Sequence, residues 1–100
     1  MTTRTIWKYE LHHLHEQEIK LKKGAEVLCV QVQFEKACIW VLVDPAETVE
    51  EVRTFVLYGT GHDIKTAIGT SVKYIGTFQL GLGTFIGHLF EKIFLMLCVC

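Results

Sequence analysis

The stretch that decides the fold is GAEVLCVQVQFEKACIWVLVDP, residues 24–45. Its first half alternates apolar and polar residues, which is typical of a strand with one buried face. The apolar set is Leu28, Val30, Val32 and Phe34. Its second half, residues 37–43, is apolar on both faces, as expected of a central strand. We predict a hairpin whose tight turn is Glu35 and Lys36, and Asp44 with Pro45 ends it because proline cannot donate to a ladder.

Alternation on either side of this hairpin predicts further strands. In residues 6–11 one face carries Trp7, Tyr9 and Leu11, and the other carries Ile6, Lys8 and Glu10. Short strands follow at 18–21 and 52–59, and a Gly81-Leu82-Gly83 turn joins strands at 71–80 and 84–93. On one side of the strand at 71–80 we place Val72, Tyr74, Gly76, Phe78 and Leu80. Gly76 and Gly87 inside strands indicate bulges or close backbone approach.

These patterns predict a mainly β fold: an antiparallel β-meander forming a small sandwich or barrel, with at most one short helix. No segment sustains a period of 3.6, and single helical turns are the most that residues 46–51 and 64–71 suggest. Residues 1–92 form a single β domain, and residues 93–100 form an apolar C-terminal tail. That tail is read as an extra strand or as a segment buried in an oligomer contact.

Composition narrows the class of protein. The chain has 100 residues, of which 50% are hydrophobic and 21% charged, so we expect one ordinary globular domain. Its net charge of −1 argues against long nucleic acid as a partner. Because the start is polar, we expect no signal peptide. The apolar end is shorter than the about 20 residues that span a bilayer, so we expect no membrane contact.

The cysteines and histidines suggest no metal or cofactor. Cys29 and Cys38 lie in apolar runs, Cys98 and Cys100 end the chain, and no C-x-x-C pair occurs, so we expect free thiols in a reducing cytoplasm. His12, His13 and His15 form an H-H-x-H cluster; on a strand two of them share a face and could bind a metal, whereas the alternative is a polar surface connector.

One candidate binding site is GTGHD, residues 59–63. Backbone amides of Gly59, Thr60 and Gly61 can form an anion-binding nest, and Thr60 and His62 add side-chain donors. The spacing fits neither a P-loop nor a dinucleotide fingerprint. The alternative is a β-turn in which the glycines supply unusual φ and Asp63 caps the next segment.

A second candidate is the set Arg4, Trp7, Lys8 and Tyr9. A base can stack on an aromatic ring while a cation meets its phosphate, as in nucleotide sites. The same grouping suits a protein interface, and core packing is the third reading.

No catalytic constellation is found, so we predict that the protein is not an enzyme. His62 and Asp63 are adjacent, so on an extended chain their side chains point apart. Ser71, the only serine, lies in no nucleophile elbow.

The motifs TIWKYEL, GAEVLCVQVQ, IWVLVDP, YGTGH, YIGTFQ and GHLFE occur in this order. Over residues 5–91 the chain resembles a family of small phage- and prophage-encoded proteins of unknown function. The resemblance implies a phage origin and a compact β-rich domain, and it transfers no catalytic residue. Lys23 stands where the family usually has proline, and the segment from Lys92 onward lies outside the family pattern.

Together these points predict a non-enzymatic phage protein that counters a host defence system in the host cytoplasm. More specifically, we expect the protein to sequester a cyclic nucleotide immune signal. We also expect a homo-oligomer, because so short a chain seldom encloses such a ligand alone. The alternatives are a direct protein inhibitor of a defence effector, similar to an anti-CRISPR protein, and a structural or assembly protein.

Overall fold

The computed structural model describes residues 3–12 and 15–94, which contain seven strands and no helix. The strands are β1 (Thr5–Glu10), β2 (Glu16–Lys22), β3 (Glu26–Gln33), β4 (Lys36–Val43), β5 (Glu50–Gly59), β6 (Thr70–Leu80) and β7 (Phe85–Phe94). The mainly β prediction is confirmed, and neither region that suggested a helical turn forms one.

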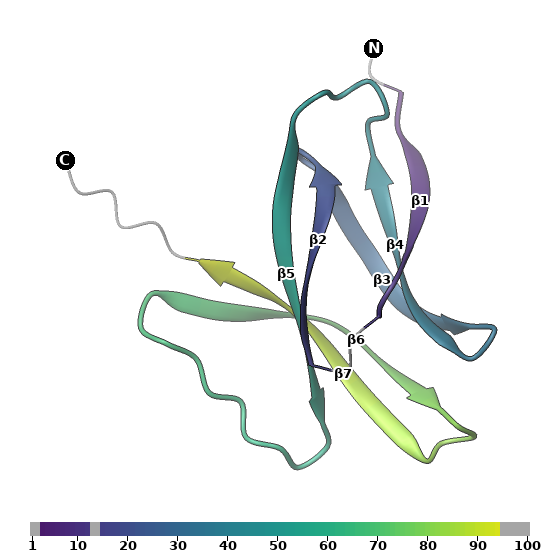
Figure 1. The fold of residues 1–100 in the computed structure, drawn as a ribbon, viewed down its shortest axis with the longest axis vertical. Coiled ribbons are helices and arrows are strands. Elements are labelled where there is room, and N and C mark those ends of the chain that lie inside the picture. Colours follow the sequence, from purple (N-terminus) through teal and green to yellow (C-terminus); the bar gives the residue numbers. More distant parts are fainter. Residues whose placement is uncertain (1–2, 13–14, 95–100) are drawn as a thin grey trace.

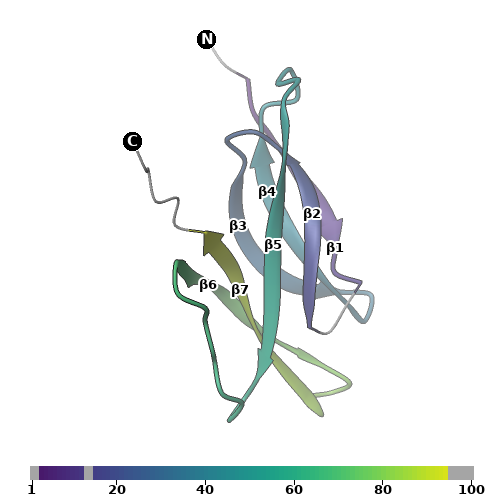
Figure 2. The ribbon, with the colours of Figure 1, turned by 60° about the vertical axis from the view of Figure 1, so that its left-hand side comes forward.

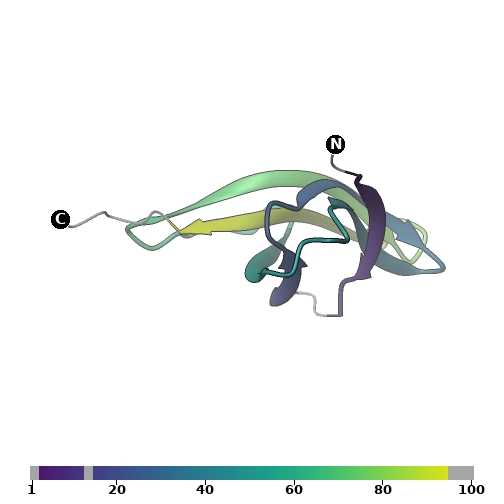
Figure 3. The ribbon, with the colours of Figure 1, turned by 90° about the horizontal axis from the view of Figure 1, so that it is seen from above.

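The strands form two antiparallel sheets (Figure 1). The three-stranded sheet has the order β1-β4-β3, and the four-stranded sheet has the order β2-β5-β7-β6. Hairpins join β3 to β4 and β6 to β7, whereas the chain changes sheet before β2, β3 and β5 (Figure 2). Seen from above, β6 and β7 form a long curved ribbon that extends past the other strands (Figure 3).

The core lies between the inner faces of the two sheets. Its buried members are Leu21, Ala25, Val30, Ala37, Ile39, Val41, Val43, Phe55, Leu57, Phe78 and Leu89. Every second residue of β4 contributes to it, because successive side chains of a strand point to opposite faces. The outer faces of both sheets therefore carry side chains that do not belong to the core. We expect these side chains to be polar, or apolar where they contact a ligand or a partner.

The tight turn between β3 and β4 lies one residue earlier than predicted. Gln33 pairs with Lys36, so the two turn residues are Phe34 and Glu35, with φ of 52° and 63°. Two positive φ values suit a type I′ turn, whose twist matches that of the flanking strands. Phe34 is therefore 86% exposed instead of joining the predicted apolar face. The glycine turn at Gly81 to Gly83 is where the sequence predicts it.

The prediction for Gly76 and Gly87 is confirmed. A Cβ on Gly76 would lie 2.8 Å from Val30 Cγ1, and a Cβ on Gly87 would lie 2.7 Å from Phe78 Cζ. The register of β6 also shifts between Tyr74 and Gly76. These glycines let a strand approach its neighbours more closely than any other residue type would.

Two bulges change which side chains share a face. In β6 the bulge leaves Phe78 buried on the inner face, while Tyr74 is 55% exposed, so the predicted single apolar side of this strand is wrong. In β3 the register shifts between Val27 and Cys29, and Leu28 is 43% exposed. An extra residue reverses the alternation beyond it, which a simple period of two cannot anticipate.

The C-terminal boundary also differs from the expectation. β7 continues to Phe94, so the first two residues of the predicted tail belong to the sheet. Cys98, Cys100 and the rest of the tail lie outside the described residues. Across residues 3–12 and 15–94, the structure has no helix of the length and apolar character needed to span a membrane.

Candidate functional site

The outer face of the three-stranded sheet presents an aromatic side chain at its centre. Trp40 lies on β4 and pairs with Lys8 of β1 on one side and Cys29 of β3 on the other. Residues that pair directly across an antiparallel ladder point to the same face, so these three side chains lie in one row. We predicted β4 to be covered on both faces. It is central, but its outer face retains a half-buried Trp40.

Around this row lies a surface hollow of about 470 Å³, which we call the Trp40 hollow. It is lined by Ile6, Leu28, Cys29, Gln31, Val32, Gln33 and Trp40. Ile6 is 54% exposed and Leu28 is 43% exposed, so the rim is apolar. The bulge in β3 leaves Leu28 exposed beside the row. An apolar hollow with a few polar groups is the usual form of a ligand or partner site.

The polar residues that line the Trp40 hollow are Gln31 and Gln33, and Lys8 adjoins it through Gln33. The Lys8 ammonium donates a hydrogen bond to Gln33 Oε1 at 2.6 Å, so the lysine side chain reaches across the sheet beside Trp40. Glutamine amides can both donate to and accept from a ligand edge. The arrangement therefore offers a ring face for stacking, one positive charge and two amides.

The structure separates Lys8 from the aromatic residues next to it in the sequence. Trp7 and Tyr9 point to the inner side of the sheet, because side chains alternate along β1. Tyr9 is half-buried and packs against the core, and this burial, together with the negative charge of Glu50, raises the pKa of its phenol. Trp7 remains 38% exposed, and Arg4 precedes the strand in an exposed position.

Residues 59–62 form the turn that was one of our two readings. The His62 amide donates to the Gly59 carbonyl at 3.1 Å, and Gly61 has a φ of +87°. Beside the turn is a shallow hollow of about 310 Å³, lined by Gly59, Thr60, His62, Gly83, Thr84, Phe85 and Ile86. Gly59, Thr60 and His62 thus meet the β6–β7 hairpin at one open depression.

Behind this turn lies a hydrogen-bond network that sequence reasoning missed. The ring of His88 contacts Thr60 Oγ1 at 2.8 Å through Nε2, and Thr77 Oγ1 at 2.9 Å through Nδ1. Thr77 in turn contacts the Tyr74 hydroxyl at 2.6 Å. Thr77 and His88 pair directly across the β6–β7 ladder, so the register of this hairpin was the signal that could have revealed them.

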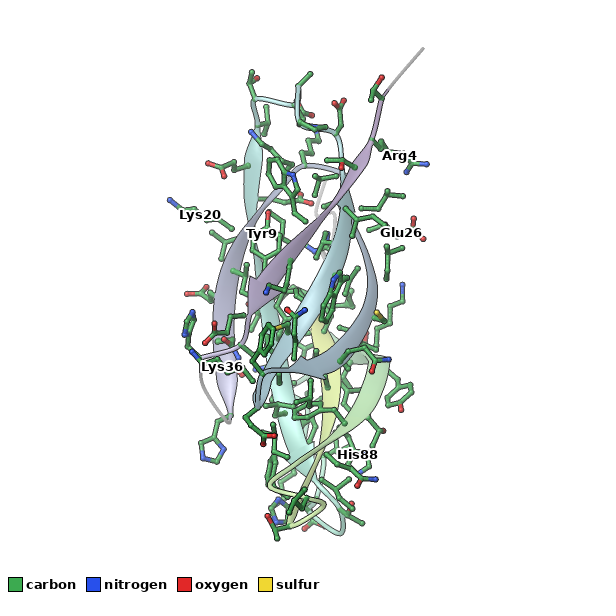
Figure 4. All side chains as sticks on the ribbon, turned by 90° about the vertical axis from the view of Figure 1, so that its right-hand side faces the viewer. Arg4, Tyr9, Lys20, Glu26, Lys36 and His88 are labelled. Atoms are coloured by element: carbon green, nitrogen blue, oxygen red, sulfur yellow. The ribbon has the colours of Figure 1, made fainter. Side chains whose placement is uncertain are left out.

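The two predicted groups of binding residues do not converge within one chain. Figure 4 shows Arg4 and His88 at opposite ends of the molecule, and Thr60 lies at the His88 end because it contacts that ring. Arg4 therefore cannot meet the same small ligand as Thr60 in a single copy.

The ionisable groups of the interior have structural roles. Arg53 and Glu91 form a bidentate ion pair with N–O distances of 2.7 and 2.8 Å, and Arg53 also donates to the Ala25 carbonyl. Burial raises the pKa of the Cys38 thiol. Within residues 3–12 and 15–94, no cluster of three or more His, Cys, Asp or Glu residues could hold a metal ion. His13 lies outside those ranges.

The fold and this surface define a small two-sheet β-domain with a solvent-facing aromatic hollow. The chain belongs to the DUF7352 family, a domain of unknown function, whose family model matches residues 2–94. This match extends to the last described residue of β7. Comparison with curated proteins and with solved structures found no match.

Proposed function

We propose that this protein is a non-enzymatic, phage-encoded binding protein that sequesters a cyclic nucleotide signal of a host defence system in the host cytoplasm. The observation that carries the proposal is the Trp40 hollow, in which a half-buried indole is flanked by Lys8, Gln31 and Gln33. The phage origin is proposed from the ordered motifs by which the chain resembles a family of small phage-encoded proteins.

Each group of the Trp40 hollow has a task in holding a nucleotide. A base stacks on the indole, a contact worth about 1–3 kcal/mol per base. Gln31 and Gln33 hydrogen-bond the edge of the base, and the Lys8 ammonium meets a phosphate. The lining holds one thiol, that of Cys29, and no histidine or carboxylate that could activate it, which suits binding better than turnover.

Calorimetric titration with a panel of cyclic di- and trinucleotides tests the proposal. We expect saturable heat with at least one member, and a loss of affinity of about tenfold or more in Trp40→Ala, the size expected for one lost stacking contact. Lys8→Ala, an exposed position, checks the same site if Trp40→Ala folds poorly. Tyr74→Ala is the matched control, because it removes an exposed aromatic ring from the other sheet. Absence of heat with every nucleotide, or an equal loss in Tyr74→Ala, contradicts the proposal.

A direct protein inhibitor of a defence effector is the second candidate. The exposed apolar side chains of Ile6 and Leu28 at the rim favour it, because buried aromatic anchors with an apolar surround are typical of interface hot spots. Affinity capture from the bacterial host would then recover one stoichiometric partner with the wild-type chain and lose it with Trp40→Ala. Capture that is the same for both chains contradicts this candidate.

A further inference from the structure

We infer that β1 is a self-pairing edge, through which two copies of the chain join antiparallel and make one continuous sheet from their two three-stranded sheets. The inference concerns the free edge of the sheet beside the Trp40 hollow, and it holds whether or not a nucleotide binds there. In Figure 4 the strand β1 lies nearest the viewer.

β1 is the edge strand with the least protection against pairing, because Lys8 is the one charged side chain between Thr5 and Tyr9. In the described part of the chain the edges β3 and β6 pack against each other. The edge strand β2 carries charged side chains at Glu16, Glu18, Lys20 and Lys22, which discourage pairing. By contrast, β1 exposes an apolar side chain on each face, with Ile6 at 54% and Trp7 at 38%.

The backbone of β1 is oriented for such pairing. The Leu11 amide donates to the Ala37 carbonyl at 2.9 Å. Leu11 lies directly opposite Ala37, because the neighbouring residues Glu10 and Cys38 are paired in the register of β1 with β4. Two residues opposed in this way exchange both backbone hydrogen bonds. The backbone amide and carbonyl of the next residue along the strand point away from the partner strand. Ile6 and Lys8 therefore direct their amides and carbonyls to the free edge of the sheet.

The charges of β1 select one register for a symmetric pair. With Trp7 on the two-fold axis, Arg4 of each copy faces Glu10 of the other, and Ile6 faces Lys8. Moving the axis to Lys8 would oppose two ammonium groups, and moving it to Ile6 would oppose Arg4 and Lys8. Like charges directly across a ladder are destabilising, which disfavours both of these shifts. An axis at Tyr9 would oppose Lys8 and Glu10, but it would place no carboxylate opposite Arg4. The Trp7 register is therefore preferred, because it pairs Arg4 with Glu10.

This register gives partners to groups that lack them in one copy. Across residues 3–12 and 15–94, no carboxylate of the same chain pairs with the Arg4 guanidinium, which is exposed. The two Trp7 rings meet at a pair without backbone hydrogen bonds, where side chains approach most closely. The Trp40 hollow also gains a cation, because Lys8 of the second copy falls beside Ile6, a residue of its rim.

Charge reversal measured by sedimentation equilibrium of the full chain, with no nucleotide present, tests the pairing. We expect the wild-type chain to dimerise, Arg4→Glu and Glu10→Arg each to weaken the dimer about tenfold or more, and the double variant to recover it. The double variant also controls for the contacts of Glu10 with Lys36 and His12 in its own chain. Lys20→Glu on β2 is the matched charge reversal and leaves the dimer intact.

Cysteine cross-linking tests the register. Trp7→Cys places two thiols across the axis within reach of a disulfide, so we expect an oxidised dimer on a non-reducing gel. Lys8→Cys should cross-link no more than the wild-type chain, which carries the same native cysteines. A monomeric wild-type chain, a dimer indifferent to both charge reversals, or faster cross-linking through Lys8→Cys than through Trp7→Cys overturns the inference.

Discussion

At the residue scale, Gly87 fixes how closely β7 and β6 can pack. A Cβ at this position would lie 2.7 Å from Phe78 Cζ and 3.1 Å from the ring of Phe85. Phe78 is buried in the core, so its ring has little room to move. The ring of Phe78 can therefore pack in this position only because residue 87 has no Cβ atom.

Gly87→Ala should destabilise the protein. Forcing one extra methyl group into a packed core costs about 1–3 kcal/mol, so we expect the free energy of unfolding to fall by that amount. Urea denaturation followed by circular dichroism measures the change. Ser71→Ala, an exposed position on β6, serves as control and should change little. A Gly87→Ala variant as stable as the wild type would show that the ring of Phe78 yields freely.

The two cysteines of the three-stranded sheet should differ in reactivity. Cys38 is 2% exposed and its burial raises the pKa of its thiol, whereas Cys29 is half-buried and lines the Trp40 hollow. The thiolate is the reactive form, so mild alkylation at pH 8 should modify Cys29 well before Cys38. Peptide mass mapping distinguishes these sites from Cys98 and Cys100. Equal rates at Cys29 and Cys38 would contradict the burial of Cys38.

The same pKa shift gives the direction of a pH effect. A thiol whose pKa is raised by folding keeps its proton longer in the folded chain than in the unfolded one. The contribution of Cys38 to stability is therefore complete below the ordinary thiol pKa and declines as the pH rises above it. Cys38→Ala should reduce this alkaline decline in urea denaturation at a series of pH values, and a decline that is unchanged would rule out Cys38 as its source.

At the element scale, the β3–β4 hairpin has a turn of the right shape with unfavourable residues. Phe34 and Glu35 both have positive φ, which costs residues with a side chain about 1–2 kcal/mol each. Asn followed by Gly is the preferred pair for this turn. The double variant Phe34→Asn, Glu35→Gly should raise the free energy of unfolding by about 1 kcal/mol, because the chain there is exposed and loses no packing. A lower urea midpoint would contradict this account of the turn.

The elements also show what the sequence could predict. Alternation and turn residues locate all seven strands approximately, and the glycines inside β6 and β7 correctly indicate close approach of the backbone. The predicted turn at Glu35 and Lys36 lies one residue too late, because neither Phe34 nor Glu35 favours positive φ. The bulge at Leu28 is not predicted, since no glycine or proline marks it.

Long-range pairing is the part that the sequence could not supply. β1 pairs with β4 and β2 pairs with β5, and no local signal indicates either choice. For this reason the sequence predicts Trp40 in a strand covered on both faces, and it groups Lys8 with Trp7 and Tyr9. The register of β1 with β4 instead brings Lys8 beside Trp40. The proximity of Thr77 and His88 also depends on a strand register. That register could have been predicted, because a short hairpin turn joins the two strands.

At the scale of the whole molecule, the candidate surfaces lie at different places on one small domain. The Trp40 hollow and the free edge of β1 adjoin, because Ile6 belongs to both. The turn at residues 59–62 lies toward the His88 end, away from Arg4 (Figure 4). A small ligand that met both Arg4 and Thr60 would therefore have to bridge two copies of the chain.

The central claim is that the Trp40 hollow holds a nucleotide base, and fluorescence titration of the Trp7→Phe variant tests it most directly. The chain has two tryptophans, so this variant leaves Trp40 as its only indole. Titration with the panel of cyclic di- and trinucleotides should change its emission in a saturable way with at least one of them, because a stacked base alters the surroundings of the ring. Emission that stays constant with every nucleotide at millimolar concentration would contradict the account.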